Sequence, residues 1–127
     1  MVAPREVGTG TVLVVDDEPA VLNAMVRALR GHGRVLPAED VDEALRLLRS
    51  EAVDIVLADY RMPGGTGEDL FRAMSRDWPH VRRALVSGTP PAHLDRLLAE
   101  GLVELFLAKP WTLDDLLAAV NKLSAPR

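Results

Sequence analysis

Four short apolar runs of strand length most constrain how this chain can fold. The segments between them carry apolar residues at helical spacing, and a weaker strand pattern at 34–37 contains a proline that suits a sheet edge. Five strands then alternate with five helices. Such alternation predicts an α/β fold in which right-handed crossovers place helices on both faces of a parallel sheet.

Capping and breaking residues place the helix ends. Pro19 suits a first helical turn, and a helix is also predicted to start at Pro90-Pro91 with Thr89 as its cap. The three predicted capping pairs are Asp40 with Glu43, Thr66 with Asp69, and Thr112 with Asp115. The strands are expected at about 11–16, 34–37, 54–58, 82–86 and 103–107.

Composition excludes several classes of protein. The 127 residues suffice for one domain, and a net charge of −4 argues against a nucleic-acid or anionic-membrane surface. With no cysteine, disulfide and thiolate chemistry is excluded. No apolar stretch is long enough to span a membrane, and residues 1–10 lack the apolar core of a signal peptide, so they are interpreted as a flexible tail. A cytoplasmic protein is the expectation.

A polar side chain of a chemically useful kind follows each apolar run. The runs are 12–15 before Asp16 and Asp17, 55–58 before Asp59, 84–86 before Ser87, and 105–108 before Lys109. Singly, each residue has an ordinary explanation, because acids offset the helix macrodipole and short polar residues form turns. Together they would meet at one edge, because the carboxyl ends of parallel strands lie there and open α/β sheets bind ligands there.

The predicted cluster requires a positive partner. Unit charges about 4 Å apart repel by roughly 4 kcal/mol at an effective dielectric near 20, so three carboxylates need a counter-charge. Mg²⁺ prefers such oxygen ligands, and Lys109 adds a second positive charge. A carboxylate nucleophile with a metal, an amine and a hydroxyl suits phosphoryl transfer.

These residues give the chain a family resemblance. The matching stretches are 14–18 (VVDDE), 54–63 (DIVLADYRMP) with Gly67, 85–88 (LVSG) and 106–110 (FLAKP). In order and spacing, over residues 11–123, the chain resembles the receiver domain of bacterial two-component response regulators. The resemblance implies a flavodoxin-like (βα)5 fold, doubly wound, with strand order 2-1-3-4-5. It divides the chain into a tail at 1–10, a receiver domain at 11–123, and a tail or linker start at 124–127.

The resemblance also implies roles for the acidic residues. Asp59 would be the phosphoacceptor, taking its phosphoryl group from a sensor histidine kinase or a histidine phosphotransfer protein. Asp17, Asp59 and the backbone carbonyl of Arg61 would ligate Mg²⁺ or Mn²⁺, and Asp16 would act through a bound water. Lys109 would pair with the phosphoryl oxygens.

Further roles follow from the same resemblance. The Lys109–Pro110 bond would be cis, Ser87 would move to bind the phosphoryl group, and Phe106 would turn inward as the switch aromatic. The switch would alter the face formed by helix 4, strand 5 and helix 5, at about 90–123. The same face is a candidate interface for a homodimer. The output partner is unknown and would be a separate protein or a fused effector domain, with no direct nucleic-acid or membrane contact.

Two other functions stay open at this point. A metal-dependent phosphatase with an aspartyl nucleophile would also use this chemistry, but such enzymes usually carry Asp-x-Asp on the first strand, whereas Asp16 and Asp17 are adjacent. A phosphorylation-independent scaffold would not need the five predicted pocket residues, yet all of them are present: Asp16, Asp17, Asp59, Ser87 and Lys109. The leading hypothesis is that the chain is a signalling domain. Its only catalysis would be of its own phosphorylation and dephosphorylation.

Overall fold

A parallel β-sheet of five strands forms the centre of the computed structural model, which describes residues 10–126. The sheet order is β2-β1-β3-β6-β7, and every neighbouring pair in it is parallel. These strands are β1 (Thr11–Val15), β2 (Arg34–Ala38), β3 (Ile55–Ala58), β6 (Arg82–Ser87) and β7 (Leu105–Ala108). Counted along the chain, this is the predicted order 2-1-3-4-5, with the proline-containing strand at an edge. The predicted flavodoxin-like α/β fold is confirmed.

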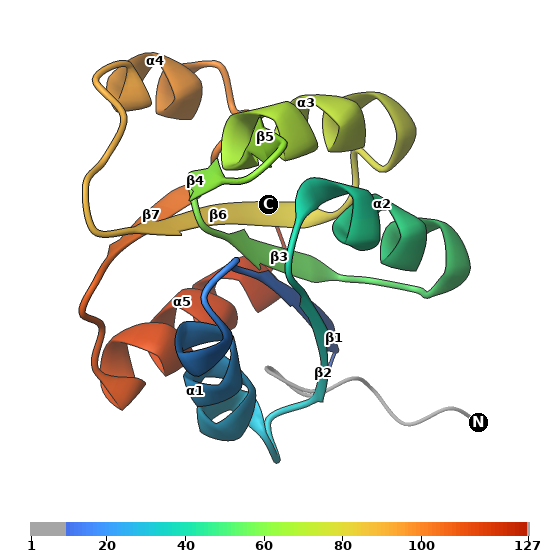
Figure 1. The fold of residues 1–127 in the computed structure, drawn as a ribbon, viewed down its shortest axis with the longest axis vertical. Coiled ribbons are helices and arrows are strands. Elements are labelled where there is room, and N and C mark those ends of the chain that lie inside the picture. The colour runs from blue at the N-terminus through green and yellow to red at the C-terminus, as the bar shows by residue number, and fades with distance from the viewer. Residues whose placement is uncertain (1–9, 127) are drawn as a thin grey trace.

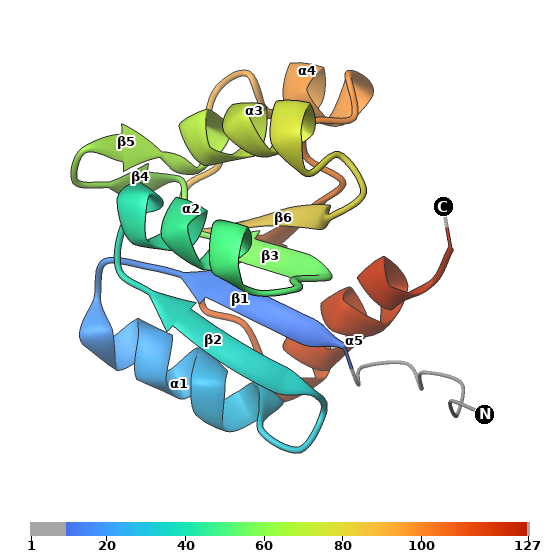
Figure 2. The ribbon, with the colours of Figure 1, turned by 90° about the vertical axis from the view of Figure 1, so that its right-hand side faces the viewer.

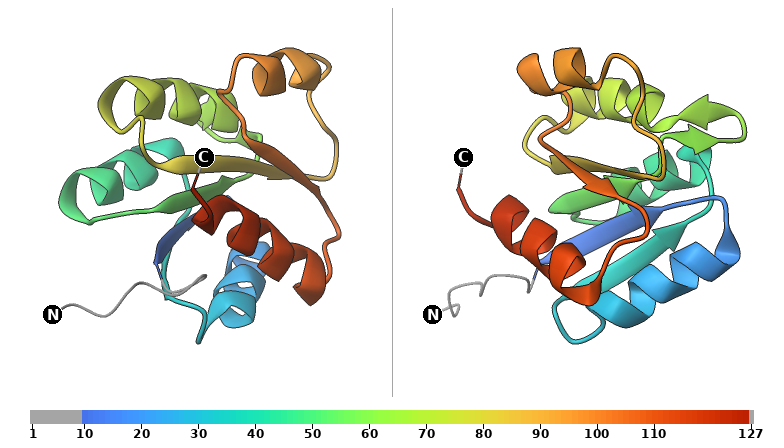
Figure 3. Two further views of the ribbon diagram at one scale, coloured as in Figure 1. Left: turned by 180° about the vertical axis from the view of Figure 1, so that it is seen from behind. Right: turned by 90° about the vertical axis from the view of Figure 1, so that its left-hand side faces the viewer.

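Helices cover both faces of the sheet (Figures 1 and 2). They are α1 (Pro19–Leu29), α2 (Val41–Ser50), α3 (Gly67–Asp77), α4 (Leu94–Ala99) and α5 (Leu113–Ser124). Helices α2, α3 and α4 lie over one face, where Leu13, Phe71 and Leu97 belong to one buried cluster. Helices α1 and α5 lie over the other, where Val12, Met25 and Leu116 belong to a second (Figure 3). Burial on both faces explains why the strands are continuous apolar runs.

Side-chain caps fix most of the helix starts. Thr66 and Thr112 each form the predicted reciprocal capping box with the residue three positions on. The Asp40 box is only half formed: Asp40 accepts the Glu43 N–H at 2.8 Å, but the Glu43 carboxylate accepts the N–H of Glu39 instead. Pro19 is the first residue of α1, as predicted.

The prediction for the fourth helix was wrong at its start. Helix α4 begins at Leu94 rather than at Pro90, and His93, not Thr89, precedes it. A residue before proline is disfavoured in the helical region, so Pro90 cannot readily continue into a helix through Pro91. The Thr89 side chain therefore caps no helix, and α4 has only six residues.

The following strand also starts later than predicted, at Leu105 rather than 103. The backbone N–H groups of Leu102 and Val103 both donate to the Leu97 carbonyl, at 3.1 and 3.2 Å. Gly101, at φ 77°, makes the turn that allows these bonds. Val103 therefore belongs to the end of α4 and not to the sheet.

Two very short strands lie outside the main sheet. The predicted turn after Asp59 contains a small antiparallel ribbon of β4 (Arg61–Met62) and β5 (Gly65–Thr66). Helix α5 extends one residue past the predicted domain boundary, to Ser124. The predicted tail at 1–10 lies outside the described residues except for Gly10, as does Arg127. Within residues 10–126, no helix has the length and apolarity needed to cross a membrane.

Gly67 should tolerate no side chain, because the start of α3 lies against the loop that follows β3. A Cβ at this position would lie 2.6 Å from the Asp59 carbonyl oxygen and 2.8 Å from a methyl carbon of Leu85. The Gly67 N–H also donates to the Tyr60 carbonyl at 2.8 Å. We expect Gly67→Ala to lower the free energy of unfolding by about 1–3 kcal/mol in urea denaturation.

Gly88 provides the matched control for this substitution. A Cβ there would meet nothing within 4 Å. Gly88→Ala should leave stability unchanged or slightly raised. Equal stability of the two variants would contradict the close approach of α3 to Asp59.

Candidate functional site

Three carboxylates meet at the carboxyl edge of the sheet. Asp16 and Asp17 follow β1 and Asp59 follows β3, and one oxygen from each lies within 4.8 Å of the others. The parallel register pairs Val15 with Ala58, which brings Asp16 and Asp59 side by side. Asp16 is 1% exposed and Asp59 9%, while Asp17 is the most open of the three. The predicted convergence is therefore present.

Lys109 reaches this cluster from the end of β7, an edge strand of the sheet. It follows β7, which is separated from β3 by β6. Its Nζ donates to Asp16 Oδ2 at 2.7 Å and lies 3.4 Å from Asp59 Oδ2. The lysine thus offsets part of the negative charge of both buried carboxylates.

Backbone groups orient the two buried carboxylates. The Glu18 N–H donates to Asp16 Oδ1 at 2.9 Å, and the Tyr60 N–H donates to Asp59 Oδ1 at 2.8 Å. Both oxygens of Asp16 are therefore engaged. Among the described residues, the contact found for Asp59 Oδ2 is the longer one with Lys109, so Oδ2 is the less engaged of the two Asp59 oxygens.

Burial and the neighbouring charges shift two pKa values in the site. Burial raises the pKa of Asp59; Lys109 opposes this and Asp16 adds to it, so the pKa lies above its ordinary value. Burial alone would lower the pKa of Lys109. The hydrogen bond to Asp16 and the charges of both carboxylates outweigh burial, and the net pKa of Lys109 is raised. Lys109 is therefore a permanent cation at neutral pH.

Ser87 occupies the end of β6 beside this cluster. Its side chain is buried, and its hydroxyl donates to the Thr89 carbonyl at 3.0 Å. Its own carbonyl accepts the Lys109 N–H at 3.0 Å, so the two residues are joined through the backbone. The Lys109–Pro110 bond is cis, as expected. The hydroxyl is engaged in the loop that leads to α4.

Phe106 and Arg61, which were also given roles from the sequence, lie outside the cluster of carboxylates and Lys109. Phe106 is half-buried on β7, in register with Leu85 of β6, and packs against the cluster under α2, α3 and α4. Arg61 begins β4, two residues after Asp59, and its side chain is exposed. Their predicted roles as switch residue and metal ligand stay predictions.

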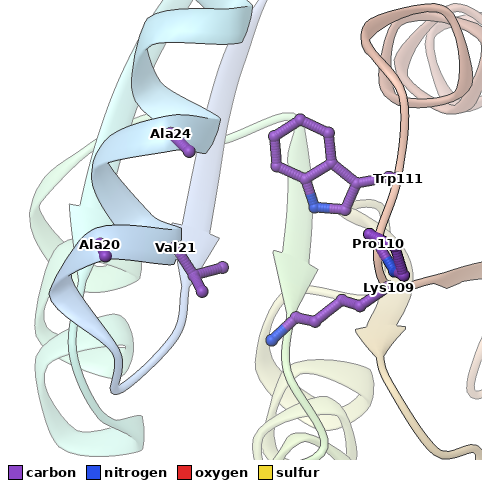
Figure 4. A pocket seen from close by; sticks show the side chains of 6 residues that line it. All are labelled: Ala20, Val21, Ala24, Lys109, Pro110 and Trp111. Atoms are coloured by element: carbon purple, nitrogen blue, oxygen red, sulfur yellow. The ribbon is translucent and has the colours of Figure 1, made fainter.

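An open pocket of about 460 Å³ borders Lys109 on the side of α1. Its lining residues are Ala20, Val21, Ala24, Lys109, Pro110 and Trp111. The Trp111 ring faces α1 across the pocket (Figure 4). A molecule bound here would therefore contact the residue that offsets the charge of the acidic cluster.

The donor set fits a hard divalent cation. Carboxylate oxygens are the ligands that Mg²⁺ and Mn²⁺ prefer, and three of them lie together here. One oxygen of Asp16 is bound to Lys109 and the other to a backbone N–H. Asp17 and Asp59 are consequently the members with more freedom to ligate an ion directly.

Comparison with known proteins identifies the family. The family model described as the response regulator receiver domain matches residues 12–121. This chain belongs to that family. Receiver domains are signalling domains of two-component response regulators, and the resemblance drawn from the sequence is confirmed.

Individual relatives differ in how much of their length the receiver domain spans. The hydrogenase transcriptional regulatory protein HoxA of Cupriavidus necator is 36% identical over 113 residues, which are 88% of this chain but only 23% of the relative. The chemotaxis protein CheY of Pseudomonas aeruginosa is 30% identical over 116 residues, 88% of this chain and 94% of that protein. The signal receiver domain of an HD domain-containing protein from Pseudomonas fluorescens Pf-5 has a TM-score of 0.84 at 27% identity and covers 91% of this chain and 94% of its own.

Several contacts of this receiver domain could not be predicted from the residue types in the sequence. The N–H groups of Glu18 and Tyr60 are main-chain donors, so no residue type reports them. The bond from Ser87 to the Thr89 carbonyl depends on the loop conformation. His93 and Glu68, which meet between α3 and α4, are far apart in the sequence.

The raised pKa of Asp59 predicts a stability gain from removing its charge. Because the folded-state pKa exceeds the ordinary value, ionisation costs the folded state free energy as pH rises through that pKa, and the cost vanishes at lower pH. In metal-free buffer at neutral pH, Asp59→Asn should raise the free energy of unfolding measured by urea denaturation. The gain should fade in acid.

Lys109→Met is the matched variant, with an expected effect on stability opposite to that of Asp59→Asn. It leaves Asp16 and Asp59 without their cation and should lower the free energy of unfolding at neutral pH by about 1–3 kcal/mol. A stabilising Lys109→Met, or a destabilising Asp59→Asn, would contradict the charge balance described.

Proposed function

We propose that Asp59 accepts a phosphoryl group from a phosphohistidine of a sensor histidine kinase or a histidine phosphotransfer protein. The observation that carries this is the buried acidic cluster with Lys109 2.7 Å from Asp16 and 3.4 Å from Asp59, within a receiver domain. The chain spans only about a quarter of the length of relatives such as HoxA, which contain more than this domain.

The transfer exchanges one bond to phosphorus for another. Asp59 Oδ2 attacks the phosphorus, a P–O bond forms, and the P–N bond to the donor imidazole breaks. The departing imidazole takes up a proton from solvent. The product is an acyl phosphate on Asp59, and the nearby Lys109 ammonium offsets its added charge.

A divalent cation fits the donor set of this reaction. Asp17, Asp59 and the Arg61 backbone carbonyl would hold Mg²⁺ or Mn²⁺, with Asp16 acting through a bound water. When bound, the ion supplies positive charge that offsets the negative charge of the phosphoryl oxygens. Asp16 meanwhile keeps Lys109 in place through the 2.7 Å bond.

Ser87 and Phe106 would convert phosphorylation into a change of shape. A Ser87 hydroxyl that turns to the phosphoryl group must leave the Thr89 carbonyl, which frees the loop before α4. Phe106, half-buried on the neighbouring strand, would then turn inward. The face formed by α4, β7 and α5 would change and bind the output partner, which is a separate protein, a fused effector domain or a second copy of the chain. The signal is limited by the difference in stability that the phosphoryl group gives the two conformations.

The family assignment disfavours the two alternatives. A phosphatase would need turnover of a free phosphomonoester, and a scaffold would not need the charge balance between Lys109 and two buried carboxylates. Turnover of generic phosphomonoesters, or absence of Mg²⁺ binding, would revive them.

Asp59→Asn should abolish phosphorylation. Beryllofluoride with Mg²⁺ mimics the phosphoryl group, so it should perturb the NMR spectrum of the wild type, and acetyl phosphate should add a phosphoryl group that mass spectrometry detects. The Asn variant lacks the reacting oxygen and should show neither response. A wild-type spectrum unchanged at saturating Mg²⁺ and beryllofluoride would overturn the proposed function.

Ser87→Ala should separate phosphorylation from its readout. The variant keeps Asp59 and the acidic cluster, so acetyl phosphate should still modify it. It lacks the hydroxyl that would follow the phosphoryl group, so beryllofluoride should cause smaller chemical-shift changes in residues 89–99 than in the wild type. Undiminished changes there would exclude Ser87 as the reporting residue.

A further inference from the structure

A polar network joins both ends of α4 to one turn of α3. Glu68 Oε1 contacts His93 Nε2 at 2.5 Å, just before α4. Arg72, one turn further along α3, donates to Glu68 at 2.8 Å and to Glu100, just after α4, at 3.0 Å. We call these four residues the α3–α4 clamp. The hydrogen bond to His93 lowers the pKa of Glu68 against the effect of burial, and Arg72 lowers it further, so Glu68 is ionised at neutral pH.

Beyond the clamp, α4 is held by a small apolar contact and, just after its end, by Arg83 of β6, which donates to the Gly101 and Leu102 carbonyls at 3.2 and 2.8 Å. It has six residues, too few to be stable by its own backbone bonds, and His93 provides no side-chain cap. Leu97 alone of its residues is fully buried, Leu94 is half-buried, and Leu98 is 38% exposed. The clamp is therefore a substantial part of what fixes the position of α4.

The clamp is connected to the phosphoacceptor by two routes that meet at His93. On one, the Tyr60 ring lies edge-on to the His93 ring with centroids 6.2 Å apart, and the Tyr60 N–H donates to Asp59. On the other, the Ser87 hydroxyl holds the Thr89 carbonyl in the loop that ends at His93. A change at Asp59 that draws Ser87 away from Thr89 would act directly on the His93 end of α4.

We propose that Glu68 and His93 are positioning residues that hold α4 in its unphosphorylated place and thereby set how readily Asp59 switches the domain. This inference rests on the proposed function. A contact made in only one of two conformations shifts their equilibrium by its own free energy, and by linkage it changes the affinity for the ligand that favours the other. Breaking the Glu68–His93 contact should therefore tighten binding of a phosphoryl mimic, although neither side chain touches it.

The test measures the apparent affinity for beryllofluoride in the presence of Mg²⁺. His93→Ala and Glu68→Ala should each tighten binding about two- to fivefold, the range expected for a partly exposed polar contact. Simple electrostatics cannot give this result. Glu68→Ala removes a negative charge, which favours an anion, whereas His93→Ala removes an imidazole and no negative charge. If both variants tighten binding, the shared cause is loss of the contact between Glu68 and His93.

Two further variants control the measurement. His93→Gln keeps an N–H that can donate to Glu68 and should restore the wild-type affinity. Arg76→Ala removes an exposed charge of α3 for which the described residues show no polar partner, and it should also match the wild type. Both positions 68 and 93 are partly exposed, so these variants are expected to remain folded.

The outcomes separate the two proposals. A wild type that responds to beryllofluoride, with His93→Ala or Glu68→Ala at unchanged or weaker affinity, overturns the clamp and leaves the proposed function intact. Equal tightening by Arg76→Ala also overturns the clamp, because any loss of charge on α3 would then suffice. A wild type with no response overturns the proposed function, and the clamp with it.

Discussion

The ion pair between Lys109 and the two buried carboxylates is the interaction on which the rest of the structure depends. It draws together the ends of three strands that are dispersed in the sequence: β1 and β3, which are neighbours in the sheet, and β7, which β6 separates from β3. Two buried anions without a cation would be costly, and so would a partly buried lysine without the anions. The parallel sheet is what makes this arrangement possible, because it delivers all three strand ends to one edge.

The backbone around the site completes the arrangement. Glu18 and Tyr60 hold one oxygen of Asp16 and of Asp59 with their N–H groups, and α3 approaches the Asp59 carbonyl so closely that only glycine fits at position 67. These contacts limit the rotation of both carboxylates. Asp59 is consequently left with one oxygen directed toward Lys109, a preorganised position for the phosphoacceptor role that we propose.

The sequence predicted the sheet and the site well because both depend on strong local patterns. Strands buried on both faces must be apolar throughout, and a side chain that follows such a strand must lie at the sheet edge, so Asp16, Asp59 and Lys109 could be placed together. The pattern failed at α4. Its start at Leu94 depends on two prolines and on contacts of His93 with distant residues, and its end depends on Gly101 and the Leu97 carbonyl. Contacts of that kind leave no periodic signal.

The weakness of α4 and the rigidity of the acidic cluster are complementary. A site that holds a reactive carboxylate needs a fixed geometry, whereas a segment that reports on it needs two positions of similar free energy. Helix α4 has little buried surface, and the polar contacts of Glu68, Arg72, His93 and Glu100 are partly exposed and individually modest. In our proposal one new phosphoryl group suffices to break a contact of that size, whereas a helix held by a large apolar face would not be released so easily. The segment that the sequence predicted least well is therefore the one in which we place the change of position.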